Sequence, residues 1–84
     1  MRLLFSPAAA KALARMPRKE GEGLLAKLRQ VAGDPTGKHP WAKRLTGQPG
    51  FRLRQGDWRA VYRLDHEAGE MIVDRIARRD EVYR

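Results

Sequence analysis

Alternation of apolar and polar positions is clearest in the stretch FRLRQGDWRAVYRLD, residues 51–65. Apolar residues take nearly every second place on each side of Gly56 and Asp57, as expected for two strands that each bury one face. A glycine in the first central position favours a two-residue type II′ turn. The pattern therefore predicts a β-hairpin in which Gln55 lies opposite Trp58.

The two faces of this hairpin differ in chemistry. Counting outward from the turn places on the core face Phe51, Leu53, Trp58, Ala60, Tyr62 and Leu64. The other face receives Arg52, Arg54, Arg59, Val61 and Arg63. Arg54 then faces Arg59 across the strands, and a like-charge pair of this kind is destabilising by itself. We interpret the arginine face as an anion site, the alternative being a polar face that is merely solvated.

Upstream of the hairpin the hydrophobic period becomes helical. Residues 2–6 form a short apolar run that predicts a strand, and Ser6 followed by Pro7 is a typical helix start. The alanine-rich stretch after Pro7 continues as a helix until Pro17. A second helix is predicted over 18–33, where three-and-four spacing joins Leu24, Leu25, Leu28, Val31 and Ala32.

The remaining segments complete the predicted fold. Residues 36–50 are rich in Gly, Pro and Lys and predict a connection, with Trp41 and Leu45 anchoring it to the core. Another strand is predicted over 70–77, in which we expect Asp74 to pair with a neighbouring arginine. Residues 1–84 are thus predicted to form one α+β domain: an N-terminal strand, a two-helix antiparallel hairpin, and a three-stranded antiparallel meander whose sheet carries the helices on one face.

Composition narrows the function. Eighteen Lys and Arg against ten Asp and Glu give a net charge of +8, and thirteen of the eighteen are Arg. Guanidinium groups bind phosphates and carboxylates in bidentate fashion, so phosphate or carboxylate partners are expected. The absence of cysteine and of a predicted membrane-spanning segment favours a cytoplasmic protein.

Several other kinds of site are not expected. His39 and His66 lie far apart in sequence in predicted loops, which makes a zinc site improbable. The sequence carries neither a Gly-rich phosphate loop before a helix nor a nucleophile-elbow motif. We therefore predict no metal and no cofactor.

The tail ARRDEVYR places Arg78, Arg79 and Tyr83 after the last strand, where they could fold over the arginine face. Guanidiniums together with a phenol suit RNA, because the former hold phosphate and the ring can stack on a base or join proton transfer. The alternative for Tyr83 is a ring packed at the rim of the core.

The sequence resembles the RelE/ParE superfamily of toxins from bacterial toxin–antitoxin systems. The stretches that carry the resemblance are SPAAAKALARMPRKEGEGLLAKLRQVAGDP, AKRLTGQPGFRLRQGDWRAVYRLD and IVDRIARRDEVYR. RelE-type members are ribosome-dependent messenger RNA endonucleases, so the resemblance implies that activity, mRNA on the ribosome as the substrate, and an antitoxin that forms a hetero-oligomer with the toxin. A ParE-like gyrase inhibitor and an inactive relative that only binds an antitoxin are the alternatives.

The resemblance also implies site residues. The catalytic candidates are Arg52, Arg54, Arg59, Arg79 and Tyr83, and the candidates for RNA binding are Arg63, Arg78, Lys43 and Arg44. Some nucleases of the family have lysines where this chain has Arg52 and Arg54, and others use a Glu and a His. Arginine stays protonated and is a poor general base, which leaves Tyr83 or a group from the ribosome or substrate as the proton acceptor.

Overall fold

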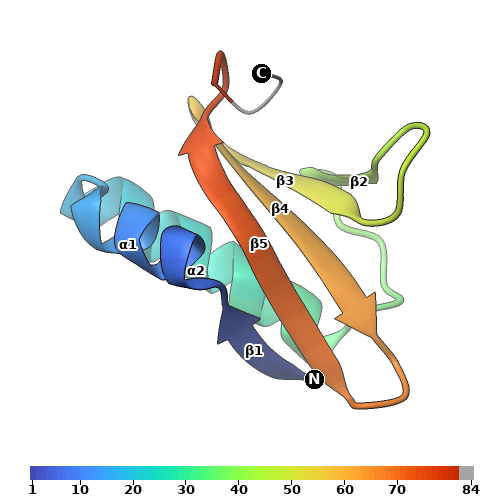
Figure 1. Ribbon diagram of the computed structural model, residues 1–84. Helices are drawn as coiled ribbons and strands as arrows, with labels where there is room; N and C mark the ends of the chain where they lie inside the picture. The colour runs from blue at the N-terminus through green and yellow to red at the C-terminus, as the bar shows by residue number, and fades with distance from the viewer. Residues whose placement is uncertain (82–84) are drawn as a thin grey trace.

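The fold is a five-stranded sheet with two helices on one face (Figure 1). The computed structural model describes residues 1–81, in the order β1 (Arg2–Phe5), α1 (Pro7–Arg15), α2 (Arg18–Gly33), β2 (Ala42–Arg44), β3 (Phe51–Gln55), β4 (Trp58–Asp65) and β5 (Glu70–Arg78). The strand order is β1-β5-β4-β3-β2, and β1 is parallel to β5 while the other neighbours are antiparallel. Neither α1 nor α2 combines the length and apolar character that a membrane-crossing helix needs.

The predicted α+β order is confirmed, but the three-stranded meander is incomplete. β2 is an additional strand inside the segment that the sequence predicted to be a plain connection, so four strands follow the helices. It has three residues, too few for an alternating pattern to stand out. It is defined by its pairing with residues 51–53 of β3, in which Lys43 lies opposite Arg52.

The predicted hairpin register is confirmed in full. Gln55 pairs with Trp58, Arg54 with Arg59, and the pairing continues to Phe51 opposite Tyr62. Gly56 has a φ of 57°, and every residue with a positive φ among 1–81 is a glycine, so φ of Asp57 is not positive. A positive φ at the first central residue alone is the signature of a type II′ turn.

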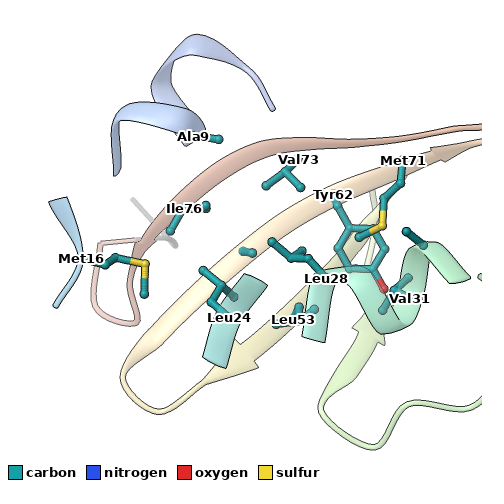
Figure 2. Packing of buried hydrophobic residues seen from close by; sticks show 12 residues of the cluster. Ala9, Met16, Leu24, Leu28, Val31, Leu53, Tyr62, Met71, Val73 and Ile76 are labelled. Atoms are coloured by element: carbon teal, nitrogen blue, oxygen red, sulfur yellow. The ribbon is translucent and has the colours of Figure 1, made fainter. Parts of the chain in front are cut away.

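The core lies between the helices and the sheet (Figure 2). The helical spacing of α2 turns Leu24, Leu28 and Val31 toward the sheet, where they are fully buried. They pack in one cluster with Leu53 of β3 and Val73 of β5. Because these side chains fix the inner face, the alternate residues of β3 and β4 must point away from the helices.

β5 contains a bulge that settles the placement of Asp74. The pairing steps from Val61 opposite Arg75 to Tyr62 opposite Val73, which leaves Asp74 as an extra residue. Arg63 donates hydrogen bonds from Nε and Nη2 to the Asp74 carboxylate, at 2.7 and 3.0 Å. The predicted pairing of Asp74 with a neighbouring arginine is thereby confirmed.

Candidate anion-binding site

An open cleft of about 420 Å³ lies beside the outward residues of the hairpin. Its lining includes one lysine and four arginines, namely Lys43, Arg52, Arg54, Arg59 and Arg79. Pro40, Trp41 and Asp80 complete the lining. We call this feature the arginine cleft.

Strand pairing brings these cations together. Lys43 of β2 lies opposite Arg52 of β3, and Arg54 of β3 lies opposite Arg59 of β4. Leu53 and Ala60 are fully buried against the core, so the residues beside them in each strand project from the face opposite the helices. Residues 16 positions apart in sequence, Lys43 and Arg59, thus contribute to one surface.

The tail supplies the fifth cation. The backbone N–H of Arg79 donates to the carbonyl of Asp57 at 2.7 Å, which holds the end of β5 beside the hairpin turn. Beyond it the chain turns back, with the N–H of Glu81 donating to the Arg78 carbonyl at 2.9 Å. The Arg75 guanidinium donates to the Glu81 carbonyl at 2.8 Å. These bonds place Arg79 and Asp80 at the arginine cleft.

The cations of the cleft repel one another. Burial lowers the pKa of the Arg59 guanidinium, and the charges of Arg52, Arg54 and Arg79 lower it further. The charge of Asp57 raises this pKa but offsets the lowering only in part. Arg59 also donates to the carbonyls of Gly56 and Trp58 at 2.8 and 2.9 Å, which ties it to the turn. A bound anion would relieve this repulsion, since opposite charge favours the protonated guanidinium.

Trp41 and Asp80 are lining residues that the sequence did not single out for this site. The sequence predicts Trp41 as a core anchor, and the residue does pack against the core while also lining the cleft. The backbone N–H of Arg54 donates to the Trp41 carbonyl at 2.8 Å. This pairing explains why Trp41 lies beside the arginines, and nothing short of the β2–β3 register could have revealed it.

The structure separates the predicted site residues into two groups. Lys43, Arg52, Arg54, Arg59 and Arg79 converge on the cleft, whereas Tyr83 lies outside the described residues. Three predicted RNA-binding arginines are not among the lining residues, namely Arg44, Arg63 and Arg78.

These three arginines have other neighbours. Arg63 is paired with Asp74. The Arg44 guanidinium lies over the ring of Phe51, at 5.2 Å from its centroid. The Arg78 guanidinium lies over the ring of Trp58 at 5.9 Å. Contacts with core-facing rings hold Arg44 and Arg78 on the helix side of the sheet. Arg78 also lines a smaller cavity of about 270 Å³ next to Arg79.

Comparison with solved structures identifies similar folds. The isolated RelE toxin of E. coli is 28% identical, with a TM-score of 0.78 over 98% of this chain and 89% of that one. The toxin of the intact E. coli RelBE toxin–antitoxin complex is 25% identical, with a TM-score of 0.78 over 92% and 94%. The YoeB/ParE toxin of Agrobacterium tumefaciens, at 17% identity, shares the fold with a TM-score of 0.79 over 93% and 98%.

Sequence comparison assigns the family. A comparison with curated proteins finds no match. The family model of the ParE toxin of the type II toxin–antitoxin system parDE matches residues 3–83. Together with the fold and the arginine cleft, this match shows that the chain belongs to the RelE/ParE superfamily of type II toxin–antitoxin toxins.

Proposed function

We propose that this toxin is a ribosome-dependent mRNA endonuclease whose arginine cleft binds the scissile phosphodiester. The observation that carries the proposal is the convergence of five cations on one open cleft from three strands and the tail. Folding alone does not favour such a cluster, because the like charges oppose each other. A polyanionic substrate would compensate the repulsion, and RNA is the polyanion on which RelE-type toxins act.

The chemistry follows from the residues present. In the cleavage reaction the ribose 2′-hydroxyl loses its proton and attacks the adjacent phosphorus, and the leaving 5′-oxygen takes up a proton as its bond to phosphorus breaks. Arg52, Arg54, Arg59 and Arg79 would stabilise the additional negative charge of the phosphorane between these steps. This stabilisation is an electrostatic role that permanently protonated guanidiniums fill well.

Proton transfer needs a different group. Among residues 1–81 that line the cleft, Asp80 is the one carboxylate. A carboxylate within reach of the 2′-hydroxyl can act as a general base. We propose Asp80 as this base, with Tyr83 or a group of the ribosome as the alternatives.

A second candidate function is inhibition of DNA gyrase by binding. It is favoured by the family model, which describes the ParE toxin of parDE. The arginine cleft would then bind an acidic surface of its target, and no chemistry at Asp80 would be needed. The two functions differ in whether transcripts are cut.

The protein is also proposed to bind an antitoxin. RelE relatives have been crystallised in complex with RelB antitoxins. An acidic antitoxin segment at the arginine cleft would neutralise the cations and exclude RNA. A hetero-oligomer of toxin and antitoxin is the expected resting form.

The deciding experiment combines induced expression with mapping of mRNA 5′ ends and a gyrase supercoiling assay. We expect the wild type to cleave mRNA within translated codons. Arg79→Ala and Asp80→Asn should lose this cleavage, and the control Arg29→Ala should keep it. Arg29 is exposed on α2 and does not line the cleft. Intact transcripts together with inhibited supercoiling would refute the nuclease and establish the gyrase inhibitor.

A further inference from the structure

An aromatic residue is among those that line the cleft beside the cations. Trp41 lines the arginine cleft together with Lys43, Arg52 and Arg54. Phosphate binding requires the cations and does not require an indole. Proteins that bind single-stranded RNA combine a basic groove with aromatic rings on which bases stack.

The Trp41 ring is held in a fixed position. The backbone carbonyl of Trp41 accepts a hydrogen bond from the N–H of Arg54 at 2.8 Å. This bond attaches Trp41 to β3, the strand that carries Arg52 and Arg54. The Lys27 ammonium lies 5.3 Å from the centroid of the indole and donates to the carbonyl of Arg54 at 2.8 Å. The His39 ring lies 5.1 Å from the indole at an interplanar angle of 34°. A ring ordered before binding costs little conformational entropy when a ligand packs on it.

The other tryptophan serves a different purpose. Trp58 donates from Nε1 to the Glu20 carboxylate at 2.6 Å, which joins β4 to the first turn of α2 on the helix side of the sheet. Only Trp41 of the two tryptophans lines the arginine cleft.

We propose that Trp41 is a nucleobase-contacting residue of the arginine cleft, packing against the base next to the phosphate that the cations hold. This inference rests on the proposed function, because it takes single-stranded RNA as the ligand. The contact would let the cleft discriminate between polyanionic ligands. A strand with bases gains a contact that a phosphate chain without bases cannot make, so the cleft distinguishes single-stranded nucleic acid from polyanions that lack bases.

Two ligands of equal charge test the inference. A short oligoadenylate and an abasic oligoribonucleotide of the same length are titrated against the wild-type protein, Trp41→Leu and Lys43→Ala. The leucine variant keeps an apolar side chain on the core but cannot stack. Because one base–aromatic contact changes affinity by roughly fivefold to 150-fold, the wild type should prefer oligoadenylate by about that factor. Trp41→Leu should lose this preference and bind the abasic strand as the wild type does.

Two further readouts check the assignment. Lys43→Ala should weaken both ligands equally and retain the preference, since it removes charge alone. In a Trp58→Phe background, where emission comes from Trp41, oligoadenylate should quench the fluorescence and the abasic strand should not.

The inference and the proposed function can fail separately. Equal binding of the two strands by the wild type, no binding of either strand, or a preference that survives in Trp41→Leu would overturn the role of Trp41, even if mRNA is cleaved on the ribosome. A preference that depends on Trp41 in a protein that cuts no transcript would refute the nuclease and leave the base contact standing.

Discussion

Replacing Arg54 with glutamine should stabilise the fold and weaken RNA binding at the same time. Arg54 lies directly opposite Arg59. Burial lowers the pKa values of both Arg59 and Lys27, and the charge of Arg54 lowers them further. Removing one member of a directly opposed like-charge pair relieves about 0.2–1 kcal/mol. For a domain of this size the melting temperature should rise by about 1–8 °C at low salt.

The expected binding change follows from the number of cations in the cleft. Each phosphate that a cation neutralises on a single strand contributes about −0.7 to the slope of log affinity against log salt concentration. With one phosphate for each of the five cations the limiting slope is about −3.5, so a fourfold rise in salt should weaken binding by at most about a hundredfold. With four cations the slope falls to about −2.8 and the loss to about fiftyfold.

Two measurements check this prediction, thermal denaturation at low and high salt and a salt titration of oligoribonucleotide binding. The stabilisation should vanish near 1 M salt, where screening is effective within about 3 Å. Arg29→Gln is the matched control because it removes the same charge from an exposed site outside the cleft, and it should leave the binding slope unchanged. A lower melting temperature of Arg54→Gln at low salt, or an unchanged slope, would refute the electrostatic reasoning.

Two further predictions concern stability. Ser6→Ala should cost about 0.5–2 kcal/mol in urea denaturation, because Ser6 Oγ accepts from the N–H of Ala9 at 3.0 Å as a helix cap and also donates to the Asp74 carbonyl at 2.8 Å; an unchanged midpoint would contradict this. Burial raises the pKa of the Tyr62 phenol to about 12 from 10.0. The unfolded chain then loses this proton at lower pH than the folded one, so the contribution of Tyr62 is present below pH 10.0 and is lost as the pH rises to about 12, at up to about 1.4 kcal/mol per pH unit. Tyr62→Phe should show a shallower alkaline loss of stability in denaturant titrations at pH values across this window, and an identical loss would exclude Tyr62 as its source.

The hairpin could be predicted residue by residue because two local signals agree there. The Gly56 turn sets the register and the alternation sets the faces, so the positions of Arg52, Arg54 and Arg59 follow without tertiary information. The helices were equally accessible, since Ser6 and Pro17 mark where they begin.

What the sequence did not predict depends on contacts between distant segments. β2 exists because it pairs with β3, and three residues carry too little pattern to indicate it. The same pairing places Trp41 at the cleft. Because the sequence did not predict β2, it did not predict Trp41 as a lining residue either. The alternation of inward and outward residues in β5 also could not be predicted, because a bulge that no local sequence motif indicates shifts it at Asp74.

The parallel pairing of β1 with β5 also affects the order in which the molecule matures during translation. The strand Arg2–Phe5 cannot pair until residues 70–73 have been synthesised. Contacts between residues this far apart in sequence form slowly. A nascent chain that stops before residue 70 can form its helices, but its core lacks Met71, Val73 and Ile76 of β5, which pack in the same cluster as the buried residues of α2. Arg79 is made later still, so the cation cluster is assembled only after nearly all of the residues described have been synthesised. Until these last residues are synthesised, the core lacks its β5 side chains and the arginine cleft lacks Arg79.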